Sequence, residues 1–349
     1  MSPSKKAPRS VFHQLPKVEL HRHLEGAVRI NTLFEIARQS GMDLPIYDPR
    51  RFEKFVQVDG GDVYNSTNFL AKFQTIRRFF LTPDIIKRVT CEAVADAAEE
   101  NIIYLELRFT PVALSVEKKF SLAEVMDWVI EGVQMASEDY GVIVRLIASV
   151  NRHEPVELAA QVAGLAVERR DRGLVGLDLA GNEVDFPAQP FVNIFREANE
   201  SGLQLTVHAG EWGEAASVRH AIEKFPVSRI GHGVRVIDDA RVVALAREHE
   251  TTFEVCITSN FQTGVVSALT NHPLPDMLNA GLKATINTDD PSIFHISLSE
   301  EYLLAHEVLG IPLNVLRQCT MAAAEAAFVS PEEKIELIRR LEEGWSDLV

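Results

Sequence analysis

The chain has 349 residues, of which 46% are hydrophobic and 24% are charged, and this composition excludes a disordered or fibrous protein. Its 35 Lys and Arg residues against 50 Asp and Glu residues give a net charge of −15, which argues against nucleic acid or an anionic membrane as a partner. The 3 cysteines lie far apart, so we expect neither a disulfide framework nor a cysteine-built metal site. With no signal peptide and no long apolar run, the sequence predicts a cytoplasmic protein.

Short apolar runs alternate with longer helical patterns along most of the chain. We predict eight strands over residues 18–24, 103–109, 144–150, 175–180, 203–208, 229–232, 252–256 and 283–287. The helices predicted between them include residues 121–140, 155–172, 191–201 and 238–249. Eight such strand–helix units predict a closed (β/α)8 TIM barrel. An open doubly wound sheet is the competing architecture, but no GxGxxG loop follows the first strand.

The interval between the first two strands is too long for one crossover helix. It contains helical patterns at residues 30–40, 63–80 and 83–99. We interpret the third as the crossover helix and the first two as a helical flap inserted at the barrel mouth, over residues 25–82. Because no linker interrupts the chain, we expect a single domain over residues 1–349. The first 14 residues are predicted to be a loose tail.

Polar side chains stand where the predicted strands end. His21 and His23 are two residues apart at the end of the first strand, so both point to the same face. The carboxyl ends of parallel barrel strands share one rim, and we expect the polar residues there to converge. The fifth, sixth and eighth strands contribute His208, Glu211, His232, Asp289 and Asp290.

Three imidazoles and a carboxylate suit zinc with one position left for water, whose pKa the metal lowers to about 7. Glu211, three residues after His208, is placed to hold a proton for donation. His232 is placed to orient the water or to take its proton. Asp289 and Asp290 are adjacent and cannot point the same way, so one is expected to bind metal and the other substrate. These residues predict metal-assisted hydrolysis of a small molecule and leave the leaving group open.

Several segments resemble the adenosine deaminase family, in that family's order and over about residues 15–330. They are LPKVELHRHLEGAVR, FLAKF, YLELRFTP, DLAGNE, VHAGEWG, RIGHGVRV, CITSNFQTG and INTDDPSIF. The resemblance implies a (β/α)8 barrel with one zinc ion per subunit. It implies hydrolysis of adenosine and 2′-deoxyadenosine to inosine and 2′-deoxyinosine with release of ammonia, a reaction of purine salvage. An oligomer is possible, but no sequence feature indicates one.

The resemblance also implies roles for particular residues. The zinc ligands are His21, His23, His208 and Asp289. Glu211 matches the residue that protonates purine N1, and His232 matches the histidine that orients the attacking water. The substrate contacts are His23, Glu25, Gly181 and Asp290, with the Gly181 amide facing N3 and Asp290 contacting N7 and the water.

Aromatic residues near the predicted mouth have two interpretations. Phe69 and Phe73 resemble flap residues that close over the ribose, although their i, i+4 spacing also fits ordinary helix packing. Trp212 is expected either to line the pocket or to pack behind the fifth strand.

Glu25 departs from the family pattern, because many adenosine deaminases carry aspartate there in contact with the sugar 5′-hydroxyl. The substrate therefore stays open, with adenine, aminodeoxyfutalosine and N6-methyl-AMP as alternatives. A nucleotide substrate requires a basic residue at its phosphate end, and Arg22 and Arg152 are the candidates.

Two other classes of protein remain as alternatives. The first barrel strand of a metal-dependent phosphoesterase can also carry an HxH motif. Such a site needs more carboxylate or histidine metal ligands than these strand ends offer. A non-catalytic nucleoside-binding protein is the second, and the competent residue at every catalytic position argues against it. The remaining histidines, which include His272, are expected at the surface or in capping roles, and Asp178 either braces a neighbour or ends a strand.

Overall fold

The computed structural model describes residues 9–44 and 48–346. Its eight parallel strands form one sheet in the order of the sequence, and this confirms the predicted strands and their order. The strands are β1 Lys17–His23, β2 Ile102–Phe109, β3 Ile143–Asn151, β4 Leu174–Ala180, β5 Gln204–Ala209, β6 Arg229–His232, β7 Thr252–Val255 and β8 Lys283–Ile286.

The sheet closes into a barrel just beyond the end of β8. Asp289 forms a parallel bridge with Arg22, and the backbone N–H of His23 donates to the Asp289 carbonyl at 2.8 Å. The Asp289 N–H in turn donates to the His21 carbonyl at 3.0 Å. The predicted TIM barrel is therefore confirmed, and its closure brings the HxH pair beside the two aspartates, which lie at opposite ends of the sequence.

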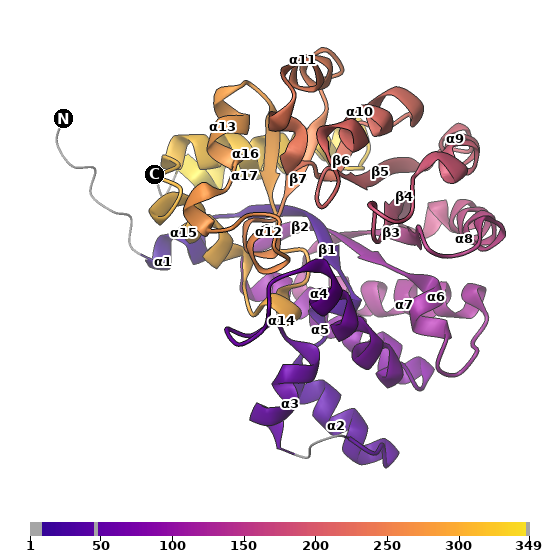
Figure 1. The fold of residues 1–349 in the computed structure, drawn as a ribbon. Coiled ribbons are helices and arrows are strands. Elements are labelled where there is room, and N and C mark those ends of the chain that lie inside the picture. Colours follow the sequence, from indigo (N-terminus) through magenta and orange to yellow (C-terminus); the bar gives the residue numbers. More distant parts are fainter. Residues whose placement is uncertain (1–8, 45–47, 347–349) are drawn as a thin grey trace.

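Helices surround the strands and bury their outer apolar side chains (Figure 1). The longer ones between consecutive strands are α5 Pro83–Glu99, α7 Leu122–Tyr140, α8 Val156–Glu168, α9 Val192–Glu200, α10 Ala215–Lys224 and α11 Ala240–Glu248. Shorter helices at or near the strand ends are α6 Pro111–Ser115, α12 Ile257–Gln262, α13 Leu274–Asn279 and α14 Pro291–Phe294. After β8 the chain continues through α15 Leu298–Glu307, α16 Leu313–Ala326 and α17 Pro331–Ser346.

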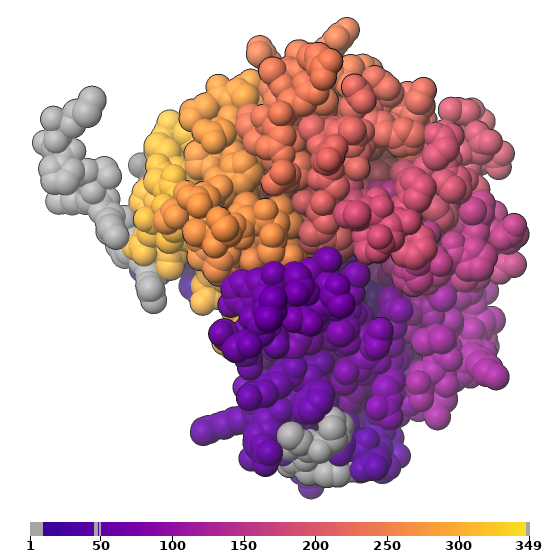
Figure 2. Space-filling view, viewed as in Figure 1, coloured from indigo at the N-terminus to yellow at the C-terminus, as the bar shows by residue number. Residues whose placement is uncertain are grey.

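The segment of residues 25–82 contains more helices than the sequence predicted. They are η1 Glu25–Ala27, α2 Ile30–Ser40, α3 Pro49–Val56, α4 Ser66–Ile76 and η2 Arg77–Phe79. The predicted helix over residues 63–80 is shorter because the Asn65 side chain accepts from Asn68 N–H at 2.8 Å and starts α4 there. The helix α3 was not predicted. In Figures 1 and 2 this segment, coloured indigo to purple, projects to one side of the barrel.

The prediction of a loose N-terminal tail is wrong for residues 9–14, which form the helix α1 (Arg9–Gln14). Phe12 is 1% exposed, and the Lys17 ammonium group donates to its carbonyl at 2.7 Å, so a buried contact holds this helix. Residues 1–8 lie outside the described residues. No helix within residues 9–44 and 48–346 has the length and apolarity that crossing a membrane requires.

Candidate metal centre and active site

A pocket lies at the carboxyl ends of the barrel strands, with a free volume of about 550 Å³ that includes the space opening to solvent. The helix α4 forms one wall with Phe69 and Phe73, and Trp212 lines the pocket as well. Most of the residues predicted for the site line it together: His23, Glu25, Gly181, His208, Glu211, His232, Asp289 and Asp290. The predicted convergence of these side chains is therefore found in the structure.

Four of these residues, His23, His208, His232 and Asp289, form a cluster with the buried His21 that could hold a metal ion. His21, His208, His232 and Asp289 each offer a ligand atom, and these atoms lie within 4.8 Å of one another. The Nε2 atom of His21 lies 3.1 Å from Asp289 Oδ1, and the Nε2 atom of His23 lies 3.4 Å from the same oxygen. The cluster thus contains all four predicted ligands, together with His232.

The orientation of the histidine rings fits a cation in this cluster. His21 Nδ1–H donates to Glu254 Oε2 at 2.8 Å, and His208 Nδ1–H donates to Asp178 Oδ1 at 2.9 Å. Each ring consequently turns the lone pair of its Nε2 atom toward the cluster. His21 Nε2 is buried without a hydrogen-bond partner, an arrangement that is costly unless a metal accepts the lone pair.

The two supporting carboxylates are themselves held by charge. Arg108 donates to Glu254 at 2.7 Å and lies 3.5 Å from Asp178, and all three side chains are fully buried. Burial alone raises the pKa of Asp178, but the neighbouring His208 and Arg108 lower it well below its usual range. Asp178 therefore stays ionised and braces His208, one of the two roles predicted for it.

A buried carboxylate outside the predicted set positions Glu211. The N–H groups of Gly210, Glu211 and Gly213 donate to Glu183 at 2.9, 2.7 and 2.8 Å, which fixes the loop after β5. Burial raises the pKa of Glu211 well above its usual range, and the charges of Asp289 and Glu183 raise it further. The sequence signal for Glu183 was its place in the DLAGNE segment, but its hydrogen bonds depend on tertiary structure.

The side chains of the adjacent aspartates point in different directions. Asp289 faces the cluster, where its Oδ2 atom accepts from the Ser259 hydroxyl at 2.7 Å. Asp290 lines the pocket, and its Oδ1 atom is buried without a hydrogen-bond partner. Burial and the charge of Asp289 raise the pKa of Asp290 well above its usual range. The carboxylate of Asp290 lies so close to Gly26 that a Cβ atom there would stand 1.7 Å from Oδ1.

The pocket also contains an acidic and a basic side chain, Glu25 and Arg77. Glu25 accepts from Thr110 N–H at 2.7 Å through Oε1, whereas its Oε2 atom is buried without a partner. Burial raises the pKa of Glu25, and the charge of Arg77 lowers it in part. Arg77, in η2, lines the same pocket, and its buried Nε atom has no hydrogen-bond partner.

Arg77 lines the pocket, whereas the two arginines that the sequence offered as candidates for a phosphate contact do not. Arg22 forms an ion pair with Glu19 at 2.6 Å, and Arg152 donates to the His208 carbonyl. Both guanidinium groups therefore have protein partners, and neither belongs to a residue that lines the pocket. Arg77 was missed because the sequence around it reads as part of an amphipathic helix.

Aromatic contacts decide between the interpretations of the mouth residues. The Phe69 ring lies 5.1 Å from Phe294 and 6.2 Å from Trp212, measured between ring centroids. Phe73 lies 5.3 Å from Phe69 and also lines the pocket. Trp212 therefore belongs to the wall of the pocket, and α4 covers it as a flap.

Among the other histidines, His272 differs from expectation because it is buried, with 3% of its surface exposed. Its capping role is found in the structure, since Nδ1 accepts from the backbone N–H of Leu274 at 3.1 Å, at the start of α13.

A (β/α)8 barrel that gathers buried histidines and carboxylates beneath one pocket is typical of metal-dependent hydrolases. The adenosine deaminase family model matches residues 16–344 of this chain. The chain therefore belongs to the adenosine deaminase family, whose members are hydrolases acting on C–N bonds.

Individual relatives agree with this assignment over nearly the whole chain. The adenosine deaminase of Vibrio parahaemolyticus is 36% identical over 333 residues, which cover 95% of this chain and 99% of that protein. An amidohydrolase from Burkholderia ambifaria, solved with bound zinc, has a TM-score of 0.90 at 27% identity and covers 99% of this chain and 96% of its own. The N6-methyl-AMP deaminase of Arabidopsis thaliana has a TM-score of 0.84 at 30% identity and covers 96% and 98%.

Proposed function

We propose that this protein is a zinc-dependent deaminase that converts adenosine and 2′-deoxyadenosine to inosine and 2′-deoxyinosine and releases ammonia. The observation that carries the proposal is one pocket that joins the metal cluster to Glu211 and Asp290. Relatives named adenosine deaminase, about 35% identical over most of the chain, support the nucleoside as substrate.

The donor set of the cluster fits zinc. We assign His21, His23, His208 and Asp289 as ligands of one zinc ion per subunit, because nitrogen donors with a carboxylate suit this metal and leave a position for water. The zinc-bound amidohydrolase structure supports this choice of metal. When bound, zinc supplies the site with a water molecule of lowered pKa.

The protein side chains then donate the proton, orient the water and bind the substrate. Glu211 holds a proton and donates it to purine N1 as the C6 amino group is replaced by oxygen from water. His232 orients that water, and Asp290 contacts it together with N7 of the ring. His23 and the backbone amide of Gly181 complete the contacts with the purine, while Glu25 faces the sugar. The flap helix α4 excludes bulk water from these groups.

A nucleoside 5′-monophosphate is the second candidate substrate, and Arg77 favours it. The Arg77 side chain is half-buried and its Nε atom has no protein hydrogen-bond partner, and a guanidinium group in this state is a ready contact for phosphate. The similarity to an N6-methyl-AMP deaminase points to the same class. Against it, Glu25 lies in the same part of the pocket, and its carboxylate would repel a phosphate.

The test is ammonia release by the purified, zinc-loaded protein on a panel of substrates. The panel contains adenosine, 2′-deoxyadenosine, adenine, AMP, N6-methyl-AMP and aminodeoxyfutalosine, with a chelated sample as the control. Metal content is measured in parallel and should equal one zinc ion per chain.

Chelator-sensitive turnover of the two nucleosides is the expected result. Turnover of a nucleotide alone would replace adenosine by the second candidate and make Arg77 its phosphate contact. Ammonia from none of the six compounds would contradict the proposed activity and favour a nucleoside-binding protein.

A further inference from the structure

Behind His232, a chain of three hydrogen bonds leads away from the metal cluster. The Asn260 amide nitrogen lies 3.2 Å from His232 Nδ1, and the Asn260 amide oxygen lies 3.2 Å from His272 Nε2. The last bond joins His272 Nδ1 to the backbone N–H of Leu274 at 3.1 Å. All three side chains are buried, so water does not compete for these groups.

The backbone end of this chain fixes the direction of every bond in it. A peptide N–H can only donate, and His272 Nδ1 must therefore accept and carry no proton. Burial lowers the pKa of His272 to about 3, so the ring is neutral and its single proton resides on Nε2. That proton points to Asn260 Oδ1, which accepts it.

The orientation of the Asn260 amide in turn determines which nitrogen of His232 carries the proton. Because its oxygen accepts from His272, its NH2 group faces His232 and donates to Nδ1. A neutral His232 with an accepting Nδ1 atom carries its proton on Nε2. This nitrogen points into the site, 3.7 Å from Glu211 Oε2 and 3.8 Å from Asp289 Oδ2.

His21 and His208 show the opposite arrangement in the same cluster. Their Nδ1–H groups donate to Glu254 and Asp178, which leaves a lone pair on Nε2 for a metal. His232 meets an amide donor where the other two meet carboxylates. Its Nε2–H has no lone pair to give, although its position alone would make it a possible ligand.

We propose that Asn260 and His272 are positioning residues that hold His232 as its Nε2–H tautomer, so that His232 donates a hydrogen bond into the site and does not bind the metal. This inference rests on the proposed function for the use of that bond, which is to orient the attacking water. It assigns a task to two buried side chains outside the catalytic set.

The decisive experiment observes the tautomer directly, by 15N NMR of protein labelled at histidine and loaded with zinc. A His232→Asn sample identifies the His232 signals, which should show protonated Nε2 and unprotonated Nδ1 in the wild-type protein. Asn260→Asp should reverse this pattern, because the carboxylate accepts from Nδ1–H and leaves the lone pair on Nε2. His272→Gln should preserve the wild-type pattern, because its amide NH2 can still donate to Asn260.

Kinetics of the same variants separate positioning from a merely structural role. We expect Asn260→Asp to lower kcat about 100-fold, the lower end of general acid–base effects, with KM changed less than about threefold. His272→Gln should retain kcat within about threefold of wild type. His306→Gln removes a half-buried histidine on α15 and serves as the matched control. Zinc content and Tm are measured for every variant, so that loss of the fold or of the metal is recognised.

A wild-type His232 protonated on Nδ1 would overturn the proposal, as would an unchanged tautomer in Asn260→Asp. Loss of the Nε2–H tautomer in His272→Gln would contradict it as well. The NMR measurement needs no substrate, so it stands apart from the activity. A protein with the predicted tautomer that releases no ammonia would refute the proposed function while leaving this inference intact.

Discussion

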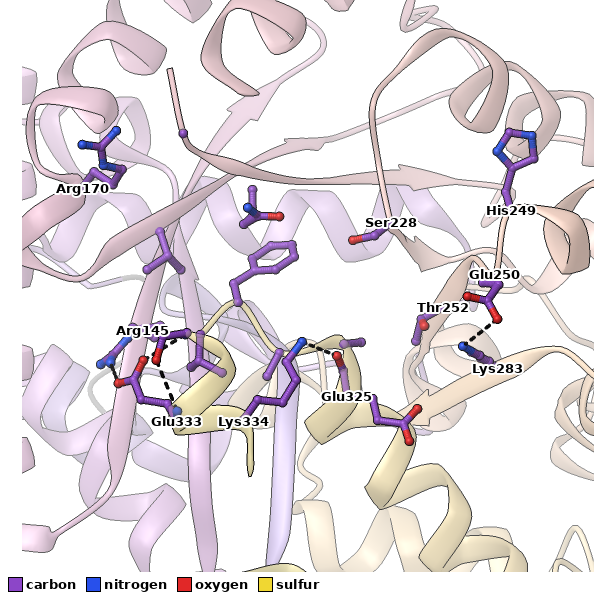
Figure 3. A pocket seen from close by; sticks show the side chains of 18 residues that line it. Arg145, Arg170, Ser228, His249, Glu250, Thr252, Lys283, Glu325, Glu333 and Lys334 are labelled. Carbon is purple, nitrogen blue, oxygen red and sulfur yellow. Dashed lines mark hydrogen bonds and ion pairs between the residues drawn. The ribbon is translucent and has the colours of Figure 1, made fainter. Parts of the chain in front are cut away.

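The barrel has a hollow at each end, and charged side chains line both of them. The two hollows differ in whether the polar atoms around them have partners within the protein. At the amino ends of the strands, a hollow of about 1,270 Å³ is lined by Gln204, Thr252 and Lys283 at the starts of β5, β7 and β8 (Figure 3). Figure 3 shows three contacts around it: Arg145 pairs with Glu333, Lys283 pairs with Glu250 at 3.6 Å, and Lys334 donates to the Glu325 carbonyl.

At the carboxyl ends the hollow is smaller, at about 550 Å³, and polar atoms in and beneath it lack protein partners. Desolvation without compensation costs free energy, so these atoms are retained where a metal or substrate supplies the missing partner. Among the described residues, buried polar atoms without a protein partner line the smaller hollow and not the larger one, so these atoms rather than the volume distinguish the two hollows. The unpaired atoms that line this hollow are Glu25 Oε2, Arg77 Nε, Trp212 Nε1 and Asp290 Oδ1, and His21 Nε2 lies beneath it.

The largest effect is expected at the carboxyl end, from Glu211→Gln. The amide cannot donate the proton that purine N1 needs, so turnover should fall by about 10²- to 10⁴-fold. Zinc content and substrate affinity should stay close to wild type, which steady-state kinetics and metal analysis will check. Glu214→Gln, at an exposed position three residues further on, is the control and should remain active. Near-full activity of Glu211→Gln would show that another group supplies the proton.

Changing Glu183, which holds the loop of Glu211, should lower the activity less than changing Glu211 itself. Glu183→Gln leaves one oxygen for three backbone donors, because an amide cannot accept through nitrogen. The loop that carries Glu211 should loosen, and kcat/KM should fall about 10- to 100-fold, since small displacements of a catalytic group are costly. Glu197→Gln on the exposed face of α9 is the control. Equal kinetics in both variants would mean that the loop holds its shape without Glu183.

A change at Arg77 should depend on the substrate. For a nucleotide, Arg77→Met removes a phosphate contact and should raise KM about tenfold, whereas for adenosine the change should stay below about threefold. The neighbouring Arg78 is exposed and provides a matched control in Arg78→Met. Measuring both variants on adenosine and N6-methyl-AMP separates the two candidate substrates. An equal loss on both would assign Arg77 to the shape of the pocket and not to phosphate.

The sequence predicted the parts of this site that follow from local pattern. Eight apolar runs with polar ends were sufficient for the barrel, and barrel geometry then brought His21, His208 and Asp289 together. Glu183 and Arg77 could not be found in this way, because their roles depend on contacts between segments that are distant in the sequence. Tertiary contacts likewise hold the helix α1, which the sequence did not predict, because its Phe12 side chain is buried.

His272 was misplaced for the same reason. It lies in the segment NHPLPD, which is typical of a polar turn, so a surface or capping role was expected. Its side chain nevertheless turns inward to Asn260, a direction set by packing and absent from the local pattern.

The buried, neutral state of His272 has a measurable consequence for stability in acid. Burial lowers its pKa from 6.5 to about 3. Below pH 6.5, His272 therefore binds a proton in the unfolded chain but not in the folded protein. This contribution is complete above pH 6.5 and is lost as the pH falls toward 3. Between pH 6.5 and 5.5 it amounts to about 1 kcal/mol.

His272→Gln isolates that contribution, because glutamine does not titrate and the other groups are common to both proteins. Urea unfolding at several pH values should give a free energy of unfolding that falls less steeply with acid in the variant. Parallel curves for the two proteins would mean that His272 already accepts a proton in the folded state.

The smallest effect is expected at the opposite end of the barrel, from Glu333→Gln on α17. The ion pair with Arg145 is partly exposed, so its loss should change the free energy of unfolding by less than about 1 kcal/mol. The activity should match wild type, because Glu333 lies at the amino ends of the strands and does not line the pocket that contains Glu211 and Asp290. A clear change in kcat would contradict the distinction between the two ends, because it would show that a side chain at the larger hollow affects the reaction.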